Sequence, residues 1–232
     1  MAQFPHDDRQ HARRGTPYAD AAAGVRMSGV LRVAHRAGND LRLLPAAIHA
    51  GADVIEADVH LRRRRLEIRH GRSLGPVPWL WEPFYLVRDL RLQLADLRAA
   101  TPPGSTLMLD LKGSSPQLGE QVRQAMAGAE PYLVCSRLWP ALEAFASEPD
   151  VKVVHSARTR GELRRLTARL RTHHTWGVSL HRELLTAAGV ADLRKQAEIV
   201  MTWPIDTLEA YDFVVRLGVN AVISNDLAVL AS

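Results

Sequence analysis

Short runs of β-branched and other apolar residues recur along the chain from residue 30 onward. The segments between them carry the apolar spacing of amphipathic helices. Eight runs predict strands at residues 30–35, 53–60, 106–111, 131–136, 151–156, 175–180, 198–203 and 219–224. Seven intervening segments predict helices at about 40–50, 86–100, 116–128, 138–147, 159–171, 182–196 and 206–217. Gly51 and Gly218 stand where helices commonly end.

Strand and helix alternate regularly, which predicts a parallel sheet with crossover helices. Eight strand–helix units is the number that closes a (β/α)8 TIM barrel. A doubly wound open sheet is the alternative, but it calls for a glycine-rich phosphate loop after the first strand. The sequence there, His35-Arg36-Ala37-Gly38-Asn39, carries no such fingerprint. We therefore predict an α/β fold with a single TIM-barrel domain.

The domain is expected to span residues 29–232. Residues 1–28 show neither hydrophobic period, so they are expected to form a short, poorly ordered N-terminal extension. The chain of 232 residues is 47% hydrophobic and 24% charged, which provides a sizeable core and excludes a disordered protein.

Cysteine content and the absence of long apolar runs bear on the compartment. A single cysteine, Cys135, excludes an internal disulfide framework and favours a reducing compartment. No run of 18 apolar residues exists, and residues 1–8 lack the order of a signal peptide. We expect a cytoplasmic protein without stable membrane insertion. The sequence leaves the oligomeric state open.

Charge points to a phosphorylated partner without choosing its class. Thirty Lys and Arg residues against 25 Asp and Glu give a net charge of +5, and this modest positive field suits either a phosphorylated small molecule or nucleic acid. The run Arg62–Arg65 is the most conspicuous basic cluster. Its place between Leu61 and Leu66 favours a solvated turn, so no nucleic-acid partner is expected, although sequence-independent phosphate attraction stays open.

Polar side chains end several of the predicted strands, where TIM barrels carry their active sites. Residues two apart on a strand share one face, which is the inward face in a closed barrel. Buried carboxylates need a compensating cation, and three carboxylates suit a hard divalent ion such as Mg²⁺ or Ca²⁺. For any single one of these residues, a solvated or salt-bridged role is the alternative. The residues are His35, Arg36, Glu56, Asp58, Asp110 and Lys112.

Together these motifs resemble the glycerophosphodiester phosphodiesterases, a family of TIM barrels. The resemblance rests on His35-Arg36, the segment 51–59 (GADVIEADV), His70 and the segment 109–112 (LDLK). Near the C-terminus, 201–203 (MTW) and 218–226 (GVNAVISND) are similar to the family's tryptophan-bearing seventh strand and glycine-led eighth. The similarity covers about residues 30–228. Its most specific part is the Glu56 to His70 spacing, typical of a two-stranded ribbon.

The resemblance implies metal-dependent hydrolysis of a small-molecule glycerophosphodiester to an alcohol and glycerol 3-phosphate, an activity of lipid metabolism. It makes Glu56, Asp58 and Asp110 ligands of Mg²⁺ or Ca²⁺. It makes His35 and His70 the acid/base pair, and it assigns Arg36 and Lys112 to the substrate phosphate. Trp203 is interpreted as a wall of the substrate pocket.

Four positions depart from the family pattern. Ala37 follows Arg36 where glycine is usual, and Asp110 stands where glutamate is usual. Gly71 follows His70 where aspartate is common, and Asn225 replaces a threonine. Aspartate is one methylene shorter than glutamate, so coordination by Asp110 calls for a bridging water or a shifted backbone. These departures keep open a catalytically weak barrel that binds phosphate or nucleic acid.

Aromatic residues cluster after His70, and four histidines stay unassigned. One interpretation is that the cluster forms a wall of the pocket for a lipid or head group, which would favour a lysophospholipase D-like enzyme. The other, which we favour, is that the rings plug the top of the barrel or pack on the following helix. Among the histidines, His155 stands at a predicted strand end where it can line the pocket, whereas His173 and His174 precede a predicted strand. The aromatic residues are Trp79, Trp81, Phe84 and Tyr85; the histidines are His155, His173, His174 and His181.

Overall fold

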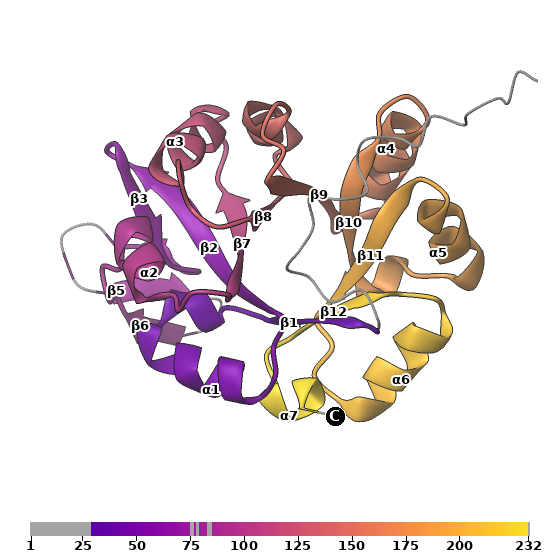
Figure 1. Ribbon diagram of the computed structural model, residues 1–232, viewed down its shortest axis with the longest axis horizontal. Helices are drawn as coiled ribbons and strands as arrows, with labels where there is room; N and C mark the ends of the chain where they lie inside the picture. The colour runs from indigo at the N-terminus through magenta and orange to yellow at the C-terminus, as the bar shows by residue number, and fades with distance from the viewer. Residues whose placement is uncertain (1–28, 75–76, 78, 83–84, 232) are drawn as a thin grey trace, which may run out of the picture.

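The computed structural model describes residues 29–74, 77, 79–82 and 85–231, so the predicted extension 1–28 and Phe84 lie outside the described residues. Within this part of the chain, eight parallel strands pair in the order β1-β12-β11-β10-β9-β8-β7-β2 (Figure 1). Pairing of β1 with β2 closes the barrel, which confirms the predicted fold. The strands are β1 (Leu31–Ala34), β2 (Val54–Arg62), β7 (Thr106–Lys112), β8 (Tyr132–Ser136), β9 (Val151–Ala157), β10 (Thr175–His181), β11 (Ala197–Trp203) and β12 (Ala221–Ser224).

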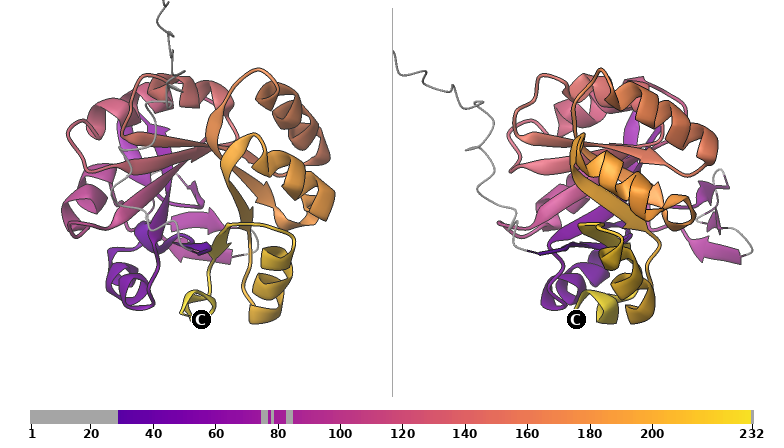
Figure 2. Two further views of the ribbon diagram at one scale, coloured as in Figure 1. Left: turned by 45° about the vertical axis from the view of Figure 1, so that its right-hand side comes forward. Right: turned by 90° about the vertical axis from the view of Figure 1, so that its right-hand side faces the viewer.

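Helices cover the outside of the barrel (Figure 2). Gly51 and Gly218 take positive φ angles of 77° and 93° just after α1 and α6, as predicted for helix ends. Thr159 and Glu162 form a capping box that starts α4. The helices are α1 (Leu44–His49), α2 (Leu94–Ala100), α3 (Gln117–Ala125), α4 (Arg160–Leu170), α5 (Ala187–Arg194), α6 (Leu208–Arg216) and α7 (Leu227–Leu230).

Short 3₁₀ helices replace or divide several predicted α-helices. The segment 138–147 forms one such helix, with Pro140 in its first turn, rather than an α-helix. The predicted helix 182–196 is divided at Thr186, whose side chain caps the start of α5. The 3₁₀ helices are η1 (Ala37–Asn39), η2 (Leu41–Leu43), η3 (Trp139–Phe145) and η4 (Arg182–Leu184).

The barrel interior is apolar except at the carboxyl ends of its strands. Alternate residues of each strand point inward, so Val54 and Met108 belong to the inner cluster while Ile55 and Leu109 pack against the helices. The same alternation turns Glu56, Asp58 and Asp110 inward. The inner cluster consists of Leu31, Val33, Val54, Met108, Leu133, Cys135, Val154, Ile199, Met201, Ala221 and Ile223.

A two-stranded ribbon extends β2 beyond the barrel. Strand β3 (Arg65–Ile68) pairs antiparallel with the end of β2. Arg63 and Arg64 form the turn with positive φ angles of 47° and 64°, and both side chains are exposed. The arginine run therefore forms the solvated turn that its position predicts.

A small three-stranded sheet follows the ribbon and projects beside the barrel (Figure 2). It consists of β4 (Arg72–Ser73), β5 (Trp79–Glu82) and β6 (Tyr85–Arg88). The prediction of a helix beginning at residue 86 is wrong, because α2 starts only at Leu94. The favoured packing of the aromatic cluster is also wrong for Trp79 and Trp81, which are 45% and 52% exposed. No helix among the described residues is long and apolar enough to cross a membrane.

Candidate active site

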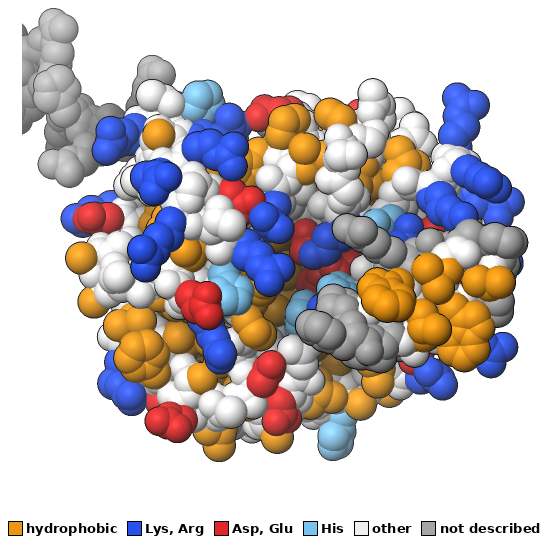
Figure 3. All heavy atoms as spheres, turned by 180° about the vertical axis from the view of Figure 1, so that it is seen from behind, with side chains coloured by type: hydrophobic (Ala, Val, Ile, Leu, Met, Phe, Trp, Pro, Cys, Tyr) orange, Lys and Arg blue, Asp and Glu red, His pale blue; other side chains and the backbone are white. Residues whose placement is uncertain are grey.

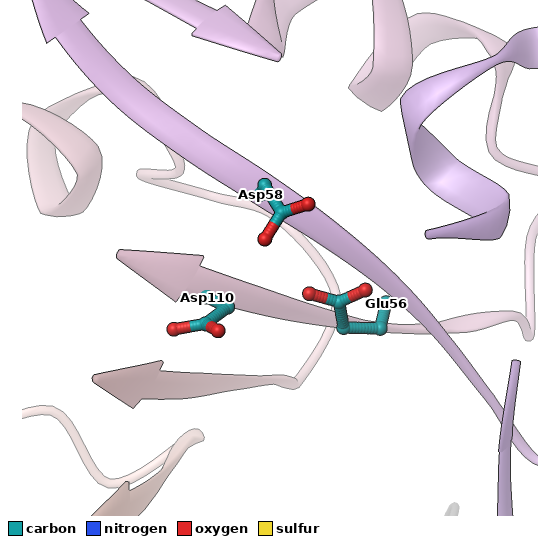
Figure 4. Close-up of side chains that lie close together, drawn as sticks. All are labelled: Glu56, Asp58 and Asp110. Carbon is teal, nitrogen blue, oxygen red and sulfur yellow. The ribbon is translucent and has the colours of Figure 1, made fainter. Parts of the chain in front are cut away.

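Three carboxylates meet at the carboxyl end of the barrel. Glu56 and Asp58 come from β2, and Asp110 comes from the neighbouring β7, directly opposite Asp58 in the parallel register (Figure 4). Each contributes an oxygen lying within 4.8 Å of the others, and Glu56 and Asp58 are buried. On one face of the molecule, acidic side chains lie in a hollow bordered by basic side chains and histidines (Figure 3).

The proximity of the carboxylates raises the energy of their charged forms. Burial, followed by repulsion from Asp58 and Asp110, raises the pKa of Glu56 well above its ordinary value. Burial likewise raises the pKa of Asp110. Burial acts upward on Asp58 too, but the charge of Lys112, the neighbouring His70 and the hydrogen bonds from Lys112 and Asn39 together outweigh burial and bring the pKa of Asp58 below its ordinary value. The negative charge of Glu56 and Asp110 is therefore only partly compensated.

Lys112 supplies part of the missing charge. Its Nζ donates to an Asp110 carboxylate oxygen and lies 3.0 Å from Asp58 Oδ1. Burial acts to lower the pKa of Lys112, but the carboxylates of Asp110, Asp58 and Glu56 outweigh this effect. The pKa of Lys112 is therefore raised above its ordinary value, and the ammonium stays charged. Asp58 Oδ1 is buried and meets this ammonium as an ion pair.

The three carboxylates fit a hard divalent cation such as Mg²⁺ or Ca²⁺. Their oxygens converge, and the raised pKa values of Glu56 and Asp110 indicate that Lys112 compensates their charge only in part. Despite the shorter side chain of Asp110, one of its carboxylate oxygens lies within 4.8 Å of the oxygens of Glu56 and Asp58.

Asn39 fixes the orientation of Asp58. Its side-chain Nδ2 donates to Asp58 Oδ2 at 2.7 Å, and its Oδ1 accepts the Asp58 backbone N–H at 2.8 Å. This two-point contact leaves Asp58 Oδ1 facing the carboxylate group. Sequence reasoning missed Asn39, although Asn39 is the last residue of η1, which follows the His35-Arg36 motif directly in the sequence.

His35 lies at the end of β1, where an asparagine determines its tautomer. Asn225 donates from its Nδ2 to both carboxylate oxygens of Asp206, so its Oδ1 is the atom that faces His35. His35 Nδ1 therefore donates to Asn225 Oδ1 at 2.8 Å, which leaves Nε2 with its lone pair, 4.0 Å from Glu56 Oε2. Burial, followed by the charge of Arg36, lowers the pKa of His35 to about 4. The departure at Asn225 thus provides a defined partner for His35.

Arg36 bridges the carboxylates and the second histidine. Its backbone is left-handed at φ 57°, and its N–H donates to Glu56 Oε2 at 2.6 Å. Its guanidinium Nη2 lies 2.6 Å from His70 Nε2. The residue after next, Gly38, packs so closely on β2 that an added Cβ would lie 2.8 Å from the Cβ of Ala57.

His70 lies past the end of β3 and contacts a carboxylate that sequence reasoning missed. Its Nδ1 lies 2.5 Å from Glu82 Oε2 on β5. Glu82 is buried, with 6% of its surface exposed. In the segment 79–82 (WLWE), a tryptophan at every second position was a signal for a strand. This pattern gave no indication that Glu82 contacts His70.

Trp203 and His181 lie together at the ends of β11 and β10. Their rings meet edge to face with centroids 5.0 Å apart. His155 does not line the interior. Since Val154 points inward, His155 points outward, where its Nδ1 contacts Thr175 and its ring meets Trp139 of η3. His173 and His174 precede β10, at the opposite end of the strand from the carboxylates.

Comparisons with known proteins give structural matches. Neither a protein-family model nor a curated protein sequence matches the chain. The glycerophosphodiester phosphodiesterase of Thermotoga maritima is similar with a TM-score of 0.69 and 16% identity, covering 86% of this chain and 96% of that one. A phosphodiesterase of Oleispira antarctica, solved with the product sn-glycerol-3-phosphate, has a TM-score of 0.68 and 16% identity over 87% and 95% of the two chains.

A Mycobacterium tuberculosis glycerophosphoryl diester phosphodiesterase domain is similar at 20% identity and a TM-score of 0.62, covering 86% of this chain and 97% of the domain. Nearly the whole of each compared structure is therefore matched by residues of this chain. The chain has the TIM-barrel fold of the glycerophosphodiester phosphodiesterases.

Proposed function

We propose that the protein is a metal-dependent phosphodiesterase that hydrolyses a glycerophosphodiester to an alcohol and glycerol 3-phosphate. The observation that carries this proposal is the convergence of three carboxylates, two histidines and two cationic side chains at one end of the barrel. The product found in the Oleispira antarctica phosphodiesterase supports this class of substrate.

The charge of the substrate determines what the site must do. A phosphodiester carries a negative charge that repels nucleophiles, and more charge develops on its non-bridging oxygens as the reaction proceeds. A divalent cation held by Glu56, Asp58 and Asp110 would polarise the phosphoryl group. Arg36 and Lys112 add positive charge at the same end of the barrel and orient the phosphate.

The two histidines divide the proton transfers. Because His35 Nδ1 carries a proton toward Asn225, its Nε2 is free to accept a proton from the attacking hydroxyl or water. His70 then donates a proton to the leaving alkoxide oxygen. The step leaves His35 protonated and His70 neutral, and proton exchange with solvent returns both histidines to their starting forms.

Release of glycerol 3-phosphate tests the proposal. The purified full-length protein is incubated with glycerophosphocholine and glycerophosphoethanolamine, with Mg²⁺, with Ca²⁺ and with chelator. We expect product with a divalent ion and none in chelator, with an exposed-carboxylate variant, Glu198→Gln, behaving as wild type. Absence of product from every glycerophosphodiester and both ions, or undiminished hydrolysis in chelator, would overturn the proposal.

A lysophospholipase D-like activity is the second candidate, and the small sheet favours it. Trp79, Trp81 and Leu86 expose large apolar side chains on the outer face of this sheet, and Trp81 pairs with Leu86 across two strands. The opposite face of the same strand supplies Glu82, which contacts His70. An acyl chain leaving the site would find apolar contacts there.

Comparison of acylated and deacylated substrates separates the two candidates. The assay compares the specificity constant for lysophosphatidylcholine with that for glycerophosphocholine below the critical micelle concentration. A higher value for the acylated substrate that falls in a Trp79→Ser and Trp81→Ser double variant favours the lysophospholipase D-like enzyme. Equal or lower values for the acylated substrate favour the glycerophosphodiesterase.

A further inference from the structure

We propose that Glu82 is the positioning residue of His70, holding it in the tautomer that carries its proton on Nδ1 and presents Nε2 to the reacting phosphate. The structural part of this inference stands on the contacts of His70 alone, whereas its effect on turnover rests on the proposed phosphodiesterase function.

The partners of His70 agree on one tautomer. An ionised carboxylate only accepts hydrogen bonds and a guanidinium only donates them. Glu82 Oε2, 2.5 Å away, therefore accepts a proton from His70 Nδ1, and Arg36 Nη2, 2.6 Å away, donates to Nε2. The neutral ring satisfies both contacts only when Nδ1 carries the proton.

Burial and strand geometry make this contact directed. Leu80 and Glu82 lie on the buried face of β5, while Trp79 and Trp81 lie on its exposed face. Only 8% of the Glu82 side chain is exposed, so water offers little competition for Nδ1. A buried carboxylate is costly unless it is paired, and His70 is the partner that faces it.

The residue after His70 cannot provide the carboxylate. A Cβ at Gly71 would lie 2.9 Å from Glu82 Oε1, 2.9 Å from Leu80 Cβ and 3.0 Å from the Trp81 carbonyl oxygen. Position 71 is therefore pressed against β5 with no room for a side chain. The Arg69 guanidinium fixes this segment by donating to the Gly71 carbonyl at 2.5 Å. The orienting carboxylate has to come from the neighbouring strand, where Glu82 supplies it.

Glu82 contacts the ring at Nδ1, whereas the other ring nitrogen, Nε2, is the one presented to the phosphate. Glu82 therefore acts on the reaction through the histidine that it orients.

The imidazole ¹⁵N and downfield ¹H NMR signals of the full-length, metal-free protein test the positioning directly. In the wild type we expect a His70 Nδ1 proton far downfield, assigned by its loss in His70→Ala. In Glu82→Gln the neutral amide oxygen is a weaker acceptor, so this signal should move upfield. In Glu82→Ala the signal should disappear. An unchanged signal in both Glu82 variants would overturn the proposal.

A matched variant separates positioning from packing. Leu80→Ala removes a buried side chain from the same face of the same strand but leaves the carboxylate in place. We expect it to lower the unfolding midpoint and to keep the His70 Nδ1 signal. If Glu82→Ala fails to fold, Glu82→Gln, which has nearly the same shape, decides. Loss of the signal in Leu80→Ala together with an unchanged signal in Glu82→Gln would also contradict the proposal.

Steady-state kinetics then connects positioning to catalysis. For glycerophosphodiester hydrolysis, we expect Glu82→Ala to lower kcat about 10- to 100-fold with KM nearly unchanged, and Glu82→Gln to recover part of the loss. A wild-type kcat in Glu82→Ala would remove Glu82 from this role. Absence of hydrolysis by the wild type, with a shifted NMR signal in the variants, would overturn the proposed function and leave the positioning intact.

Discussion

The crowding of carboxylates at the barrel end should lower the stability of the metal-free protein, and Glu56→Gln should restore it. The Glu56 carboxyl holds its proton more strongly in the folded state than in the unfolded chain. Burial, followed by the negative charges of Asp58 and Asp110, raises its pKa well above 4.5 in the folded state. The stability due to this proton is fully present below pH 4.5 and is lost as the pH rises through the folded-state pKa. Glutamine has no such proton, and its amide oxygen can still accept the Arg36 N–H.

The size of the effect follows from linkage. Each pH unit over which only the folded state keeps the proton costs about 1.4 kcal/mol. From pH 4.5 up to the folded-state pKa of Glu56, the wild type therefore loses stability that the variant keeps. At roughly 2–4 °C per kcal/mol for a chain of this length, the midpoint of the variant relative to wild type should rise by about 3–6 °C for each pH unit within that range.

Thermal unfolding followed by circular dichroism at pH 5, 6 and 7 in chelator measures this difference. The pKa of His35, lowered to about 4 by burial and by Arg36, adds stability with rising pH, but it does so in both proteins and cancels in the comparison. Glu198→Gln, which removes an exposed carboxylate, should give no pH-dependent difference. Added Mg²⁺ or Ca²⁺ should stabilise the wild type more than Glu56→Gln. The reasoning is refuted if Glu56→Gln is less stable than wild type at pH 7 in chelator, or if the difference does not grow with pH.

Three further predictions concern turnover. Asp58→Ala should abolish metal-dependent hydrolysis while the far-ultraviolet circular dichroism spectrum stays that of the wild type, and turnover near the wild-type level in this variant would exclude a metal role for the carboxylates. Asp110→Glu should keep or raise kcat, because it restores the residue usual in the similar family; loss of metal binding by calorimetry would show that the backbone has adapted to aspartate. His35→Ala and His70→Ala should each lower kcat about 10²- to 10⁴-fold with little change in KM, and the wild-type rate should follow a bell-shaped pH profile. A flat profile, or nearly full turnover in either variant, would remove that histidine from the mechanism.

The features that depend on local pattern could be predicted from the sequence. Each strand of the barrel is an apolar run bounded by turn residues, so its position was readable within a few residues. The inward orientation of Glu56 and Asp58 followed from the two-residue period of a strand alone. The 3₁₀ helix at 139–145 could not be separated from an α-helix, because both place apolar residues at similar spacing.

The contacts that orient the histidines could not be predicted, because they join segments far apart in the chain. Asn225 meets His35 only because β12 pairs with β1 when the barrel closes. Asp206, which orients Asn225, comes from the loop after β11. In the sequence, Asn225 was visible only as a departure from a family pattern, with no sign of which residue it contacts.

The two faces of strand β5 carry side chains with different roles. Its four residues alternate so that Trp79 and Trp81 face solvent while Leu80 and Glu82 face the barrel. Sequence reasoning treated the segment as one aromatic cluster and thereby overlooked the carboxylate within it. Because a strand places successive side chains on opposite faces, the exposed face can be changed without altering the contact to His70. A preference for acylated substrates and the positioning of His70 would therefore be separable: we expect substitutions at Trp79 and Trp81 to alter only the first, and substitutions at Glu82 only the second.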